Sequence, residues 1–139
     1  MKRILLTVII LGTVFFNVSS CSKSGGGTTE PPEQNLSIVI NPDPGGSVAI
    51  ALSSSYAFKL LINSTPPKNG VKIDIIGTKE SDNSVQFSST SQTSNNTITS
   101  VDLSLQNLVP GLLYVIKVDV TSLTTATNKT SLTFRVARK

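Results

Sequence analysis

The chain has 139 residues, enough for one domain with extra segments but not for two sizeable cores. It contains no His and a single Cys, which excludes an internal disulfide and any nucleophile activated by His. The formal charge is +4, but the charged residues are scattered without a basic run, which argues against nucleic-acid binding.

The first residues have the pattern of an export signal. Met1, Lys2 and Arg3 form a positive start, and the apolar stretch from Ile4 to Phe16 follows. These thirteen residues are fewer than the roughly 20 that a membrane span needs. The pattern predicts a cleaved signal peptide over residues 1–20, with a short uncleaved anchor as the alternative.

A short motif ends this segment, Val18-Ser19-Ser20-Cys21. It resembles the bacterial lipobox, in which an aliphatic residue and a small residue precede Cys. The resemblance implies that Cys21 is acylated and becomes the first residue, so that the membrane is a partner of the chain through its lipid. The alternative is a chance Cys after an ordinary signal.

The residue after Cys21 bears on the membrane that is implied. Ser22 stands where an Asp retains enterobacterial lipoproteins at the inner membrane, so the resemblance implies the outer membrane, at the cell surface or on the periplasmic face. Surface lipoproteins of Bacteroidota often carry acidic residues after the Cys, and Ser22 to Gly25 contain none. The implied localisation is therefore the bacterial envelope.

A polar linker follows the motif. Residues 21–35 hold three consecutive glycines and two consecutive prolines, and no aliphatic or aromatic residue. Such a composition cannot form a core, so we expect a flexible linker that makes no packing contacts.

From Leu36 to the end, apolar residues recur at alternate positions in short segments separated by turn residues. This period of two, in short segments separated by turns, predicts an all-β domain over residues 36–139 that is a β-sandwich or a small barrel. A stretch from Ser88 to Thr99, rich in Ser and Thr, is expected to be an edge strand with a long loop. The alternating apolar positions, which we expect to face the core, are Leu36, Ile38, Ile40; Val48, Ile50, Leu52; Tyr56, Phe58, Leu60, Ile62; Val71, Ile73, Ile75; Val85, Phe87; Val101, Leu103, Leu105; Tyr114, Ile116, Val118, Val120; and Leu132, Phe134, Val136.

One segment is more specific. Leu108, Pro110, Gly111 and Tyr114 are spaced as Leu-x-Pro-Gly-x-x-Tyr, which resembles the corner before strand F of fibronectin type III domains. The resemblance implies a single immunoglobulin-like β-sandwich of about seven strands over residues 36–139, in which the Tyr114 hydroxyl bonds to the backbone of the preceding arc. That family usually has a Trp on strand B and this chain has none, so another immunoglobulin-like sandwich is the near alternative.

The residues carry no catalytic pattern, so we expect no enzyme, no cofactor and no metal site. Glu80, Asp82 and Asn83 lack the spacing of a calcium loop and are expected to form a polar turn. Val39, Leu61, Ile76 and Val115 lie off the core parity and are candidates for an outer apolar patch.

Two functions follow from these features. The first is a non-enzymatic lipoprotein module for adhesion, scaffolding or protein interaction in the envelope. The alternative is a glycan-binding accessory lipoprotein of an outer-membrane polysaccharide-utilisation system. The aromatic residues all fall on the core parity, which favours packing over sugar stacking.

Overall fold

The computed structural model describes residues 31–139, and these residues form an all-β fold of eight strands in two sheets. The predicted fold class is therefore confirmed, with eight strands in place of about seven. The strands are β1 (Ile38–Asn41), β2 (Val48–Ala51), β3 (Tyr56–Ile62), β4 (Val71–Lys79), β5 (Val85–Gln92), β6 (Ser100–Leu105), β7 (Leu113–Ser122) and β8 (Lys129–Arg138).

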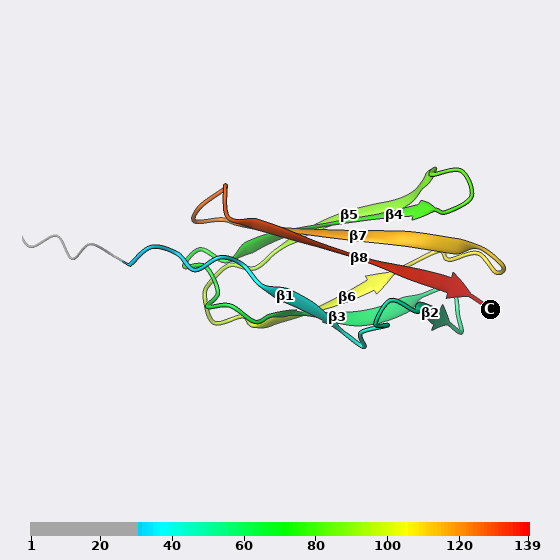
Figure 1. Cartoon of the computed structure of the whole chain (residues 1–139), viewed down its shortest axis with the longest axis horizontal. Coiled ribbons are helices and arrows are strands. Elements are labelled where there is room, and N and C mark those ends of the chain that lie inside the picture. Colours follow the sequence, from blue (N-terminus) through cyan, green and yellow to red (C-terminus); the bar gives the residue numbers. More distant parts are fainter. Residues whose placement is uncertain (1–30) are drawn as a thin grey trace, which may run out of the picture. The chain divides into compact units, whose positions relative to one another are not determined.

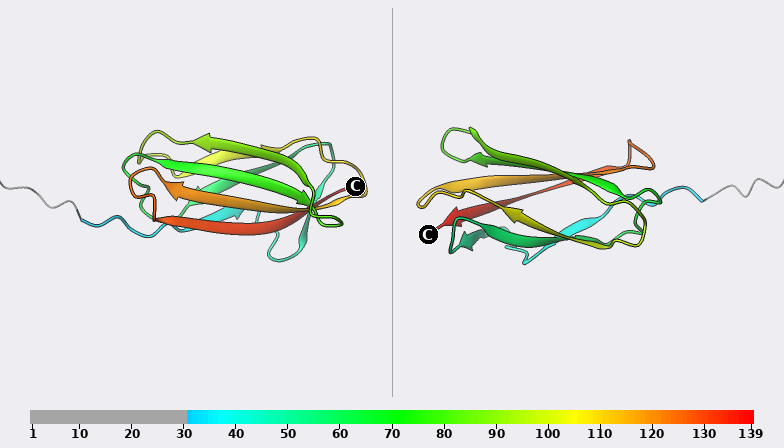
Figure 2. Two further views of the ribbon diagram at one scale, coloured as in Figure 1. Left: turned by 90° about the horizontal axis from the view of Figure 1, so that it is seen from above. Right: turned by 180° about the vertical axis from the view of Figure 1, so that it is seen from behind.

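The two sheets lie face to face as a sandwich (Figures 1 and 2). One sheet has the order β1-β3-β6, and the other has the order β2-β8-β7-β4-β5. All neighbouring strands are antiparallel except β2 and β8, which are parallel. Residues 31–37 enter at one end of the sandwich, and Lys139 lies at the other end (Figure 1).

The chain changes sheets between β1 and β2. This connection contains the cis peptide bond Asn41–Pro42 and a turn in which Ser47 N–H donates to Pro44 O at 2.8 Å. Gly45 has a φ of 58° and Gly46 a φ of 84°, a region of backbone space that other residues rarely adopt. The glycine pair therefore permits the turn that carries β2 to the second sheet.

The core is built from the inward positions of both sheets. Along β3, β4 and β7 the residues buried in the structure are those at the predicted alternate positions. Phe58 and Phe134 meet edge to face across the two sheets, with ring centroids 5.2 Å apart. The side chains that are almost completely buried include Leu60, Val71, Ile73, Leu105, Leu108, Tyr114, Ile116, Val118, Val120 and Val136.

The prediction for β2 is wrong. Ala49 and Ala51 face the core, while Ile50 and Leu52 are 43% and 85% exposed. Pairing sets this register, because Ala49 lies opposite Val136 of β8, whose side chain is fully buried. The periodicity of β2 alone fits either face, and the pairing with β8 selects the face with the smaller side chains.

The segment rich in Ser and Thr forms an edge strand followed by a loop, as expected from the sequence. β5 is the terminal strand of that sheet, and the loop after Gln92 leads to β6. Val85 is nevertheless 64% exposed, so the strand buries mainly Phe87. Phe87 lies over Gly77 of β4, where an added Cβ would stand 2.0 Å from the ring carbon Cε1. A glycine on β4 therefore makes the space for this ring.

The linker is not wholly free of contacts. Glu33 accepts hydrogen bonds from Asn128 Nδ2 and, at 3.1 Å, from Ser122 Oγ. Asn128 also donates to Gln34 O at 2.9 Å and accepts from Leu36 N–H at 2.9 Å. Hydrogen bonds therefore attach Glu33 and Gln34 to the sandwich, which the composition of the linker did not predict.

Candidate functional site

The segment with the Leu-x-Pro-Gly-x-x-Tyr spacing forms the end of the sandwich that includes the start of β7. The Tyr114 side chain is fully buried, and its hydroxyl accepts a hydrogen bond from Val109 N–H at 2.9 Å. Leu108 is 1% exposed and fills the core beneath this arc. The bond expected from the sequence is thus present.

The backbone of this corner is held from two directions. Leu108 N–H donates to Ser54 O at 2.9 Å, and Gly111 N–H donates to Arg138 O at 3.0 Å. Gly111 has a φ of 75°, which explains a glycine after Pro110. The Arg138 guanidinium donates from Nη1 to Leu108 O at 2.6 Å, a contact that the sequence did not suggest. These residues stabilise one end of the fold and present no reactive group.

The predicted lipidation site is Cys21, with Val18, Ser19 and Ser20 before it. All four residues lie outside the described part of the chain.

A hollow of about 480 Å³ lies beside β1 and β8. We call it the β1–β8 groove. Two of its walls are the strand segments Ile38–Ile40 and Leu132–Arg135, and the loop between β1 and β2 borders it. Its size falls within the range of about 300–1,000 Å³ that is typical of ligand pockets. The residues that line it are Ile38, Val39, Ile40, Asp43, Pro44, Gly46, Ser47, Val115, Leu132, Thr133, Phe134 and Arg135.

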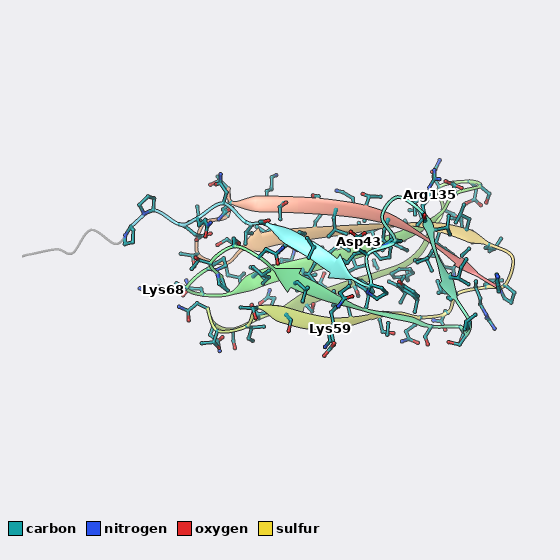
Figure 3. The ribbon with its side chains drawn as sticks, turned by 60° about the horizontal axis from the view of Figure 1, so that its bottom comes forward. Asp43, Lys59, Lys68 and Arg135 are labelled. Carbon is teal, nitrogen blue, oxygen red and sulfur yellow. The ribbon has the colours of Figure 1, made fainter. Side chains whose placement is uncertain are left out.

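Two charged side chains stand at the groove, Asp43 on the loop after β1 and Arg135 on β8 (Figure 3). Asp43 Oδ1 accepts a hydrogen bond from Gly45 N–H at 2.8 Å, which shapes the loop. Arg135 Nη2 is 2.8 Å from Glu80 Oε1, so its charge already has a partner. The residues 31–139 include no such ion partner for Asp43.

The off-parity aliphatic residues do not form the single outer patch considered from the sequence. Val39 and Leu61 are paired neighbours in the three-stranded sheet, whereas Ile76 and Val115 belong to the five-stranded sheet. The structure brings Val39 and Val115 together at the groove and leaves Leu61 and Ile76 elsewhere. The alternation along a strand predicts which residues point away from the core, but it does not predict to which sheet the strand belongs.

Two carboxylates face each other on the outer surface of the larger sheet. Asp74 of β4 pairs in register with Asp119 of β7. Hydrogen bonds from Lys72 and Thr90 lower the pKa of Asp74, and those from Lys117 and Ser131 lower the pKa of Asp119. The Lys72 and Lys117 ammonium groups each stand 2.8 Å from their carboxylate. Both Asp side chains are therefore held ionised by their neighbours, a state unsuited to a general acid.

The loop with Glu80 and Asp82 is a polar turn. Asp82 Oδ1 accepts from Ser84 N–H at 2.9 Å and from Ser84 Oγ at 2.6 Å. Hydrogen bonds from Ser84 also lower the pKa of Asp82. Across residues 31–139, no three His, Cys, Asp or Glu side chains gather closely enough to hold a metal ion.

The aromatic side chains of the described domain pack in or against the core. Phe58, Tyr114 and Phe134 are buried, while Tyr56 and Phe87 are partly buried against the same cluster. No helix within residues 31–139 is long and apolar enough to cross a membrane.

Comparison with known proteins gives matches to solved structures alone. No protein-family model and no curated protein matches the chain. Among solved structures, a β-glucuronidase of Parabacteroides merdae is similar to 77% of the present chain, with 12% identity and a TM-score of 0.46. The match covers 14% of the enzyme chain. By their own strand pairing, the described residues define an all-β sandwich domain with a groove beside β1 and β8.

Proposed function

We propose that this chain is a lipid-anchored protein of the bacterial envelope that presents an immunoglobulin-like module for protein interaction, in adhesion or scaffolding. The observation that carries the proposal is the lone Cys21, placed at the end of an export signal within a lipobox-like motif. Two or three acyl chains on this residue would hold the protein durably, because each buried methylene contributes about 0.8 kcal/mol.

The strand order supports the immunoglobulin-like assignment. In such domains strands A, B and E share one sheet, and strands C, F and G share the other. Here β1, β3 and β6 form one sheet, and β4, β7 and β8 lie together in the second. The bond between Tyr114 and Val109 supports the fibronectin type III subtype, whereas the absence of Trp departs from it.

The chemistry of the described surface supports interaction above catalysis. The carboxylates of Asp74 and Asp119 are engaged by Lys and hydroxyl donors. The aromatic rings lie in or against the core, so they offer no flat platform for sugar stacking. The β1–β8 groove provides a concave, partly apolar surface that a partner can fill.

Cell fractionation tests the proposal. The natural protein should stay with membranes after an alkaline wash, and Cys21→Ala should appear in the soluble fraction. A Ser24→Ala variant is the matched control, because it changes a neighbouring linker residue and keeps the motif. A Cys21→Ala protein that stays with the washed membranes would refute the anchor.

Protease treatment of intact cells then locates the domain. Digestion before lysis would place it at the cell surface, where adhesion partners are outside the cell. Protection until lysis would place it in the periplasm, where the partner is another envelope protein.

A further inference from the structure

Part of β8 lacks a second strand partner. β7 pairs with β8 along the length from Lys129 to Ala137, but β2 pairs only with Arg135–Arg138. Within residues 31–139, no strand therefore pairs with the side of β8 away from β7 between Lys129 and Phe134. Unpaired N–H and C=O groups at such an edge can pair with an added strand.

This unpaired edge adjoins the β1–β8 groove. Leu132, Thr133 and Phe134 line the hollow on the side of β8, and Ile38 and Ile40 line it from β1. Because successive side chains of a strand alternate between faces, an added strand beside β8 would direct every second side chain toward this apolar lining. The groove thus combines backbone groups with space for side chains.

β5, the opposite edge strand of the larger sheet, lacks this combination. β5 also has an unpaired edge, but its residues are mainly Ser, Thr and Gln, and five of the eight are exposed. Neither the β1–β8 groove nor a second hollow of about 310 Å³, lined in part by Asp102 and Leu103 of β6, includes a residue of β5. An added strand there would gain backbone bonds but little apolar burial.

The charge at the groove indicates what the partner carries. Arg135 is neutralised by Glu80, whereas Asp43 is exposed and has no ion partner within residues 31–139. Among the residues that line the groove, the uncompensated charge is therefore that of Asp43. A basic side chain on the partner would complement it.

We propose that the β1–β8 groove binds an extended segment of a partner protein by strand addition to β8 between Lys129 and Phe134. The segment places apolar side chains against Ile38, Ile40 and Phe134, and it carries a Lys or Arg next to Asp43. The unpaired stretch spans roughly 20 Å at about 3.3 Å per residue. This inference rests on the proposed role in protein interaction and specifies the class of partner.

The probes are two capped peptides of about six residues with alternating Val and Thr. One carries a single Lys at its N-terminal end, and the other carries it at its C-terminal end. Each has two relatives, one with Ser in place of Lys and one with N-methylated backbone amides. Binding to the isotope-labelled full mature chain in detergent micelles is followed by NMR. We expect saturable shifts at Ile38–Ile40 and Leu132–Phe134 with a Lys peptide, and none with its N-methylated relative.

Two pairs of proteins sharpen the test. Asp43→Asn keeps the Oδ1 acceptor for Gly45 N–H but removes the charge, so it should weaken binding of the Lys peptide about three- to tenfold. The Ser peptide should bind both proteins equally. Ser47→Trp, at an exposed position of the groove, should block binding, whereas Ser88→Trp on exposed β5 should leave it unchanged.

The inference is overturned if no peptide of the set gives saturable shifts up to about 1 mM. Equal binding by N-methylated peptides overturns strand addition, and shifts confined to β5 place the partner on the other edge. Thermal unfolding of each variant separates loss of binding from loss of fold. Membrane retention of the same proteins reports on the anchor independently, so failure of the groove leaves that part of the proposed function standing.

Discussion

The Tyr114 hydroxyl accepts a hydrogen bond from Val109 N–H, five residues earlier in the chain, at 2.9 Å. Both the arc between these residues and the start of β7 are fixed by this contact, because the ring is fully buried beneath the arc. A buried N–H group without an acceptor destabilises the fold, because its hydrogen bonds to water are lost and not replaced. The bond therefore contributes to stability beyond the packing of the ring.

We expect Tyr114→Phe to lower the free energy of unfolding by about 1–3 kcal/mol, since the ring remains while Val109 N–H loses its partner. Chemical denaturation measures the change. Tyr56→Phe is the matched control, because the Tyr56 hydroxyl makes no hydrogen bond within the described residues and the ring is only partly buried. Equal denaturation midpoints for natural protein and Tyr114→Phe would show that the corner bond does not stabilise the fold.

A second prediction concerns the stability of the contact between Gly77 and the Phe87 ring. Gly77→Ala places a methyl group 2.0 Å from the Phe87 ring, so the ring must move and the fold should lose about 1–3 kcal/mol. In a double-mutant cycle with Phe87→Ala, the second substitution should remove most of the cost of the first. Additive losses in the double variant would contradict the steric explanation.

Asn128 joins the last linker residues to the sandwich. Asn128→Ala removes hydrogen bonds to Glu33, Gln34 and Leu36, and we expect faster amide exchange at Leu36 with a loss of about 1–2 kcal/mol. The control is Asn95→Ala, whose side chain, within residues 31–139, bonds only to Thr97 two residues away. Unchanged exchange at Leu36 in the Asn128 variant would mean that this residue does not hold the linker.

The neighbouring carboxylates of Asp74 and Asp119 predict that the free energy of unfolding decreases at acid pH. The pKa values of Asp74 and Asp119 are lower in the folded chain than the usual 3.8, so the unfolded chain protonates first as pH falls. Their stabilisation is present above the unfolded pKa near 4 and is lost as pH falls through the lower folded pKa.

Urea midpoints at about pH 7, 4 and 2.5 measure this loss. A double variant, Asp74→Asn with Asp119→Asn, should lose less stability between the first and last pH than the natural protein. The same loss in both proteins would assign the acid sensitivity to other groups.

Much of the fold follows from local pattern. The alternation along β3, β4 and β7 predicts their buried faces, and the spacing from Leu108 to Tyr114 predicts the corner. These features can be predicted because strand alternation and turn formation depend on residues that are close in the sequence. The export signal and the motif at Cys21 are likewise read from neighbouring residues, and they remain predictions.

Other features depend on which strands meet. β2 turns Ala49 and Ala51 inward because β8 sets its register, and Ile50 is exposed as a result. The groove exists because β1 and β2 join opposite sheets, which leaves part of β8 without a second partner. Sequence periodicity determined which residues alternate. Pairing between distant strands decided which face is buried and which edge stays open, since those contacts form only when the two sheets pack together.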